Sequence, residues 1–164
     1  MSTSGSDDAL ALRELKYAYV RHLDTKSWDD LAGLFTDSAT ASYGGGAYRC
    51  EGRQEIMSFL VRTMGNESMH TAHRVSQPEF DIGGDVARAR WALDDTVIDQ
   101  HLGVFISGAA FYEDRYVHTG GRWLIDSTSY RRLFEYLVPL SDMPHFSLTA
   151  SWWGTDGRST LPAG

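Results

Sequence analysis

The first apolar pattern in the chain has helical spacing. Leu12, Leu15, Tyr19 and Leu23 follow one another at intervals of three and four residues, which predicts an amphipathic helix with one face toward a core. Polar residues 6–8 precede this stripe and can cap its first turn.

Two more helices and one short strand are expected before residue 66. The second helix should start at Ser27, and the third should run from near Gly52 to near Gly65. Between them, residues 38–43 are predicted to form a strand, which ends in a turn at Gly44–Gly46.

The second half of the chain has the alternating pattern of strands. The strands are expected at residues 69–82, 86–99, 104–118 and 122–137, with glycine pairs between the first two and the last two. Helices followed by a long meander indicate an α+β fold with a mainly antiparallel sheet, because parallel-sheet folds interleave the two elements. We expect one domain over residues 1–164, with its core at about 10–138 and a loose tail from 139.

Composition narrows the class of protein. The net charge of −7 disfavours a nucleic-acid partner, because phosphate binding needs a basic surface. No apolar run is long enough to cross a bilayer, and the amino terminus lacks the pattern of a secretory signal, so we expect no membrane partner. The single cysteine, Cys50, fits a reducing compartment. The sequence thus predicts a cytoplasmic protein.

Asp95 is the most informative polar position. Strand alternation over residues 86–99 places it on the face of Trp91 and Leu93 and places Asp94 on the opposite face. A carboxylate that faces a core needs a partner. The alternative is a bulge or strand end that turns Asp95 into solvent.

The two histidines of "MHTAHRV" are three residues apart. On a strand, His70 and His73 therefore point to opposite faces, and at most one can meet Asp95. A catalytic zinc site is disfavoured because it needs three converging ligands, and the pattern supplies no third. A histidine held by a buried carboxylate would instead serve as an acid–base group.

Two residues of the first helix complete the candidate chemistry. Tyr19 lies on the apolar stripe, where its hydroxyl needs a partner. Asp24 ends the helix, where the dipole gives a carboxylate no stabilisation, so it has either a functional role or the place of a solvated turn residue. No glycine-rich phosphate loop or G-x-S-x-G elbow is present, which disfavours nucleotide binding and a serine nucleophile.

The order of motifs resembles a known family. The segments "LRELKYAYVRHLDTKSWDDLAGLF", "MHTAH", "RWALDD", "GAAFYEDRY" and "GRWLIDSTSYRRLFEY" are similar to the SnoaL-like branch of the nuclear transport factor 2-like superfamily, and within it to the bile acid 7α-dehydratases. The resemblance implies a cone-shaped α+β barrel, whose curved sheet wraps three helices around an apolar pocket. It also implies a homotrimer and no cofactor.

The resemblance also implies site residues. The family's catalytic positions fall on Tyr19, Asp24, His70 and Asp95. We expect His70 to be the base, Asp95 to orient and charge-compensate it, Tyr19 to donate a hydrogen bond, and Asp24 to position one of them. The residues expected to bind substrate are Tyr43, His73, Trp91, Tyr112, Tyr130 and Arg132, and no metal is expected.

The implied activity is a hydro-lyase reaction. Its substrate would be a 7-hydroxy-3-oxo-4-ene steroid or a related polycyclic molecule. The segment after Asp95 is shorter here than in the bile acid enzymes, so the reaction type can transfer without the substrate. Two alternatives stay open: an isomerase or polyketide cyclase with a carboxylate base, and a small-molecule binding domain without catalysis.

Overall fold

A computed structural model describes residues 4–162 of the chain. In chain order the helices and strands are α1 (Ser4–Asp24), α2 (Trp28–Ala32), β1 (Phe35–Tyr43), β2 (Tyr48–Glu51), α3 (Arg53–Met64), β3 (Met69–Gly83), β4 (Val86–Asp99), β5 (Val104–Thr119) and β6 (Arg122–Pro139). Single 3₁₀ turns follow β1 at Gly44–Gly46 and β6 at Leu140–Asp142.

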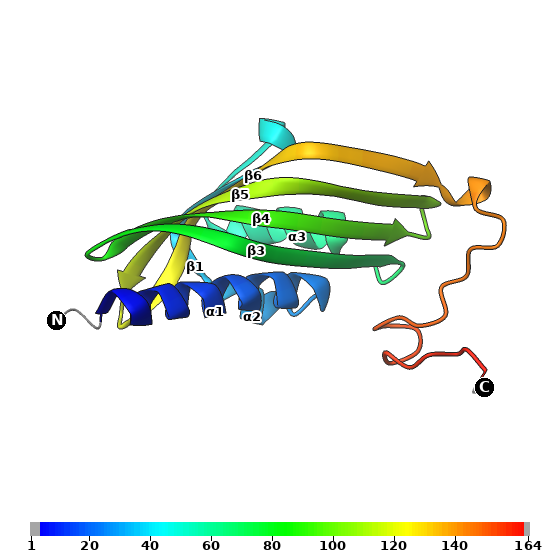
Figure 1. The fold of residues 1–164 in the computed structure, drawn as a ribbon, viewed down its shortest axis with the longest axis horizontal. Coiled ribbons are helices and arrows are strands. Elements are labelled where there is room, and N and C mark those ends of the chain that lie inside the picture. The colour runs from blue at the N-terminus through cyan, green and yellow to red at the C-terminus, as the bar shows by residue number, and fades with distance from the viewer. Residues whose placement is uncertain (1–3, 163–164) are drawn as a thin grey trace.

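The six strands form one mixed sheet in the order β2-β1-β6-β5-β4-β3. Only the β1–β6 pair is parallel, and the other pairs are antiparallel. Figure 1 shows the long strands β3–β6 curving over the helices, with α1 lying along the same face of the sheet as α3. The predicted α+β class, with a curved sheet around three helices, is confirmed.

Helical spacing located the helices because each buries one stripe. Leu12, Leu15, Tyr19 and Leu23 of α1 are all buried, as the pattern predicts. The third helix also has its expected limits. The sequence did not predict β2, whose four residues are too few to show an alternating pattern.

Alternation in β4 continues through the paired aspartates. Trp91, Leu93 and Asp95 are buried, whereas Asp94 is exposed. The inward face predicted for Asp95 is therefore correct, and the alternative of a bulge that exposes it is wrong.

The segment after β6 forms no strand within the described residues. Figure 1 shows it leaving the end of the sheet and running past that end toward the level of the helices. The Trp153 ring lies 5.5 Å from the Lys26 Nζ atom just beyond α1, so this part of the expected tail contacts the fold. Residues 163–164 lie outside the described residues. No helix in the described part of the chain is long and apolar enough to cross a membrane.

Gly108 permits a close approach between β5 and β6. A Cβ atom there would lie 2.5 Å from the Phe134 carbonyl oxygen and 3.3 Å from Nη1 of Arg132. Backbone on the neighbouring strand cannot move aside without disturbing the β5–β6 ladder, which shifts register directly after Ala109. The position of Arg132 therefore depends on the absence of a side chain at Gly108.

We expect Gly108→Ala to lower the free energy of unfolding by about 1–3 kcal/mol, because an added methyl group would overpack this contact. Gly83→Ala is the matched control, since a Cβ atom at Gly83 would meet nothing within 4 Å. Urea denaturation of both variants measures the difference. Equal stability of the two variants would contradict the packing argument.

Candidate active site

A pocket of about 460 Å³ lies among α1, α3 and the inner face of the sheet. Its wall is mostly apolar and aromatic, with a few polar groups, as is typical of sites for small organic ligands. The aromatic residues of the wall are Tyr19, Tyr43, Tyr48, Phe59, Tyr112 and Tyr130. Its histidine and charged residues are Arg62, His73, Asp95 and Arg132.

An aspartate–histidine pair stands at the edge of this pocket. Asp24 is the last residue of α1, and His73 lies on β3. The Oδ1 atom of Asp24 is 2.6 Å from Nδ1 of His73, and Oδ2 accepts the His73 backbone N–H at 2.8 Å. Oδ1 also accepts the hydroxyl of Thr71 at 2.8 Å. Asp24 thus has a specific partner and is not a solvated turn residue.

The position of Asp24 decides how His73 can act. An ionised carboxylate only accepts hydrogen bonds, so Nδ1 of His73 carries the hydrogen and Nε2 of the neutral ring is left as an acceptor. The His73 side chain is 8% exposed and lines the pocket. The arrangement is that of a general base held in one tautomer by a carboxylate.

Asp95 has a different partner from the one predicted. Nη1 and Nη2 of Arg132 donate to its two oxygens at 2.6 and 2.8 Å. His70 instead lies within hydrogen-bond distance of Gln100, with Nε2 3.1 Å from Oε1, and does not line the pocket. The predicted pairing of His70 with Asp95 is therefore wrong.

The sheet register explains this correction. His73 lies directly opposite Asp95 across the β3–β4 ladder, whereas His70 lies opposite Ile98. Because side chains alternate along a strand, His73 shares the inner face with Asp95 and His70 does not. The sequence indicated that only one histidine could face inward, but it did not identify which.

Arg132 brings a fixed positive charge into the pocket wall. Burial acts against its charged form, but the hydrogen bonds and charge of Asp95 outweigh it and raise the pKa of the guanidinium above its usual value. Its Nε atom is also 2.9 Å from a carboxylate oxygen of Glu135. Asp95 thus supports Arg132, not a histidine.

Three buried tyrosines, Tyr19, Tyr43 and Tyr112, line the pocket. Burial raises the pKa of Tyr19, Tyr43 and Tyr112, so all three remain protonated donors. The hydroxyls are close enough to influence one another, yet within residues 4–162 those of Tyr19 and Tyr43 have no partner in hydrogen-bonding geometry. Buried donors of this kind are available to an oxygen atom of a ligand.

The other predicted substrate-binding residues divide into two groups. Tyr112, Tyr130 and Arg132 line the pocket together with Tyr43 and His73. Trp91 does not, because its ring is fully buried in the core and its Nε1 donates to the Tyr116 hydroxyl at 3.1 Å. Its predicted place in the substrate site is wrong.

Sequence reasoning also missed part of the wall. Tyr48 of β2 and Phe59 and Arg62 of α3 line the pocket opposite the sheet. Phe59 stacks on Tyr43, with ring centroids 5.0 Å apart and an interplanar angle of 5°. Phe59 belongs to the apolar stripe of α3, which indicated burial but could not indicate that the stripe borders a cavity.

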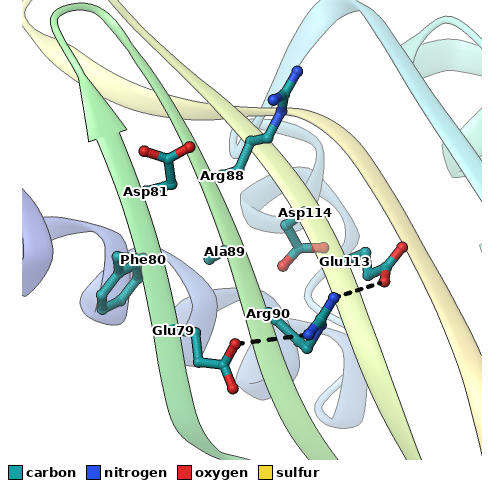
Figure 2. A pocket seen from close by; sticks show the side chains of 8 residues that line it. All are labelled: Glu79, Phe80, Asp81, Arg88, Ala89, Arg90, Glu113 and Asp114. Atoms are coloured by element: carbon teal, nitrogen blue, oxygen red, sulfur yellow. Dashed lines mark ion pairs between the residues drawn. The ribbon is translucent and has the colours of Figure 1, made fainter.

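A second hollow, of about 440 Å³, is unlike the first. Figure 2 shows Glu79, Arg90 and Glu113 in a row across β3, β4 and β5, with Arg90 between the two carboxylates. The Arg90 guanidinium is 3.7 Å from Glu79 and 3.5 Å from Glu113, and all three side chains are more than half exposed. Such exposed ion pairs contribute little energy, and the hollow contains no acid–base pair.

Nothing in the described part of the chain groups three His, Cys, Asp or Glu side chains as ligands of a metal ion. The side chains of the pocket itself offer one histidine paired with a carboxylate, the guanidinium groups of Arg62 and Arg132, and several phenol donors.

The model of the SnoaL-like domain matches residues 5–129. The chain belongs to the SnoaL-like domain family. This SnoaL-like domain is similar to two solved structures from Novosphingobium aromaticivorans. One, provisionally named a scytalone dehydratase, is 20% identical over 83% of this chain and 91% of its own, with a TM-score of 0.77. The other, provisionally named an aromatic ring hydroxylase, is 23% identical over 83% and 95%, with a TM-score of 0.73.

A third similar structure is the hexachlorocyclohexane dehydrochlorinase LinA, type 2. It is 17% identical, with coverage of 85% of this chain and 93% of its own and a TM-score of 0.72. At these identities the three similarities establish the fold. The match of the family model over residues 5–129 confirms the predicted SnoaL-like resemblance at the level of the family.

In this SnoaL-like domain we expect Arg132→Met to lower the free energy of unfolding by about 2–4 kcal/mol, because it leaves the buried Asp95 carboxylate unpaired. The value is below that of a fully buried pair because the Arg132 side chain is 24% exposed. Arg90→Met, in the exposed row of Figure 2, should change stability by less than about 1 kcal/mol. Urea denaturation measures the free energy of unfolding of both variants. An equal loss in the two would show that the Arg132–Asp95 pair stabilises the fold no more than an exposed ion pair does.

Proposed function

We propose that this protein is a cofactor-independent hydro-lyase that removes water from a hydroxy ketone of polycyclic shape. The observation that carries the proposal is the Asp24–His73 pair, whose free Nε2 belongs to an apolar pocket with buried tyrosine hydroxyls. Base and oxygen-binding donors are the groups that such an elimination needs.

In this reaction the protein itself transfers only protons and donates hydrogen bonds. Nε2 of His73 takes a proton from a carbon that is activated by the ketone, and the electron pair moves onto the ketone oxygen through the conjugated system. The hydroxyls of Tyr19 and Tyr43 donate to that oxygen as its negative charge develops. The electrons then return, the C–O bond to the hydroxyl breaks, and the imidazolium gives its proton to the departing hydroxide to form water.

Asp24 and Asp95 have separate tasks in this scheme. Asp24 fixes the tautomer of His73 and stabilises the imidazolium, as a carboxylate does in acid–base pairs of this kind. Asp95 holds Arg132 in place through two hydrogen bonds. Arg132 in turn gives the pocket wall a positive charge.

A 7-hydroxy-3-oxo-4-ene steroid is the substrate that we propose to test first. A pocket of about 460 Å³ with aromatic walls suits a rigid apolar molecule with few polar groups. The names of two structural neighbours, a dehydratase and a dehydrochlorinase, both describe eliminations, which supports the reaction type by analogy of fold. We also propose that the protein is cytoplasmic and that it needs no cofactor.

The alternatives have less support from the pocket. An isomerase or cyclase of the kind considered from sequence needs a carboxylate base, but Asp95 is the carboxylate that lines the pocket, and Arg132 occupies both of its oxygens. A domain that only binds a ligand would not need a histidine held by a carboxylate at its pocket edge.

We expect the protein to convert a 7α-hydroxy-3-oxo-4-ene steroid into a 4,6-dienone, which is detected by its long-wavelength absorbance. His73→Gln should lower turnover by a factor on the order of 10²–10⁴, because it removes the base. His70→Gln is the matched control and should have nearly normal turnover, because His70 lies on the other face of β3.

Two results would count against this proposal. Absence of dienone across a panel of hydroxysteroids and hydroxylated polycyclic ketones would exclude the proposed dehydration. Loss of turnover in His70→Gln with retention in His73→Gln would exclude the assignment of the base.

We also propose that the chain assembles with copies of itself, most simply as a trimer. Several large apolar side chains near the end of β6 are exposed in the single chain, including Leu133, Phe134, Tyr136 and Leu137. Phe134 and Tyr136 share one face of this strand by alternation. Apolar patches of this kind commonly mark interfaces between proteins.

Light scattering at micromolar concentration should therefore give a mass about three times that of the 18.3 kDa chain. Phe134→Glu with Tyr136→Glu should shift the mass toward the monomer, because the two charges would be buried at the interface. Glu79→Gln, in the charged row of Figure 2, should leave the mass unchanged. A monomer mass for the unmodified protein would overturn the assembly.

A further inference from the structure

We propose that Lys16 is a positioning residue of the pocket, whose ammonium group lies behind the rings of Tyr112 and Tyr19 and strengthens their hydroxyls as donors to an oxyanionic ligand. The inference rests on the proposed function only in taking these hydroxyls as the groups that bind a ligand oxygen. It does not depend on which reaction follows.

Lys16 belongs to a buried polar network beneath the pocket. Its Nζ atom is 2.7 Å from Oδ2 of Asp114, and neither side chain is exposed. The Tyr116 and Thr128 hydroxyls each donate to Asp114 at 2.7 Å. Trp91 donates in turn to the oxygen of Tyr116. This network joins α1 to the inner face of the sheet.

The contacts of Asp114 indicate that Lys16 is charged. Its Oδ2 atom lies against the ammonium and accepts from the Tyr116 hydroxyl, and its Oδ1 atom accepts from the Thr128 hydroxyl, which is how a buried carboxylate is stabilised in its ionised form. Burial lowers the pKa of Lys16, and the neighbouring Asp114 charge opposes that change. A neutral lysine would leave the Asp114 charge without a counter-ion in the core.

The positive end of the ion pair faces the pocket tyrosines. Nζ of Lys16 lies 3.4 Å from the ring centroid of Tyr112 and 4.6 Å from that of Tyr19. Both rings line the pocket, whereas Tyr116 and Thr128, which hold the carboxylate, do not. The ammonium thus lies in contact both with its counter-ion and with two pocket-lining rings.

A cation at this place has a defined electrostatic effect. When a phenol donates to an oxyanion, negative charge moves toward the phenol oxygen, and a positive charge behind the ring stabilises that shift. Asp114 alone would act in the opposite direction, because its charge contributes to raising the pKa of both Tyr19 and Tyr112. The charge of Lys16 therefore opposes the effect that Asp114 has on the two donors.

Packing does not account for a lysine at this position. Lys16 is four residues from Leu12 and lies on the buried stripe of α1, where a methionine or leucine would fill the space without the cost of burying a charge. A purely structural pair would influence all pocket ligands alike. A pair that tunes the hydroxyls would influence only ligands that accept a hydrogen bond.

Two ligands of matched shape separate these cases: 4-nitrophenolate, which has an oxyanion, and 4-nitrotoluene, which lacks one. We expect the wild-type protein to bind the phenolate more tightly and to shift its absorbance to shorter wavelength. Lys16→Met should weaken phenolate binding by about 3- to 30-fold and reduce the absorbance shift, with little change for nitrotoluene. Tyr116→Phe, which alters the network but retains the ammonium, is the control with little effect on either ligand.

A double-mutant cycle tests the route of the effect. In a Tyr19→Phe, Tyr112→Phe background, Lys16→Met should no longer weaken phenolate binding more than nitrotoluene binding. If Lys16→Met does not fold, Lys16→Met with Asp114→Asn removes both charges at nearly constant volume. This variant should still weaken phenolate binding more than nitrotoluene binding, by a smaller factor because the opposing charge of Asp114 is removed as well.

The inference is overturned by any of four results. Two concern the Lys16→Met variants: equal weakening of both ligands, or an unchanged preference for the phenolate in a folded variant. The third is a full effect of Lys16→Met in the background without the two hydroxyls. The fourth is a wild-type protein with no preference for the phenolate. Steroid dehydration enters none of these measurements, so failure of the proposed function would be seen separately.

Discussion

The carboxylate of Asp24 holds the end of α1 against β3, and the chemistry of the pocket depends on that contact. It accepts from the backbone and side chain of His73 and from Thr71, so one group fixes both the helix end and the imidazole. If the helix ended a residue earlier or later, the histidine would lose the partner that selects its tautomer.

Charged groups on the inner face of the sheet are each held by a residue from another element. Asp24 comes to His73 from α1, Lys16 comes to Asp114 from the same helix, and Arg132 comes to Asp95 from β6. Unpaired charges would be costly in this interior, so each pair must form as the helix packs on the sheet or as the strands pair. The absence of a side chain at Gly108 serves the Arg132–Asp95 pair, because it leaves space for Arg132 beside β5.

These pairs give the pocket two kinds of polar group. His73 offers a base held by a carboxylate, whereas Tyr19 and Tyr112 offer phenol hydroxyls with an ammonium against their rings. A proton leaving carbon and a charge arriving on oxygen are the two events of an enolisation, and the pocket has a group for each. The aromatic side chains of the wall can hold an apolar body in place.

The sequence alone determined which residues face inward, because helical and strand periodicity place side chains on faces without reference to the rest of the chain. It identified the stripe of α1, the long strands and the burial of Asp95. Lys16 and Asp114 were not singled out from the sequence, although the same periodicity places Lys16 beside the α1 stripe and Asp114 on the face of Tyr112. It could not show that His73, and not His70, meets a carboxylate, because that choice depends on the β3–β4 register and on where α1 ends. Only the tertiary structure decided the partners of Asp24, Asp95 and Asp114, since each partner is remote in sequence and is chosen by packing.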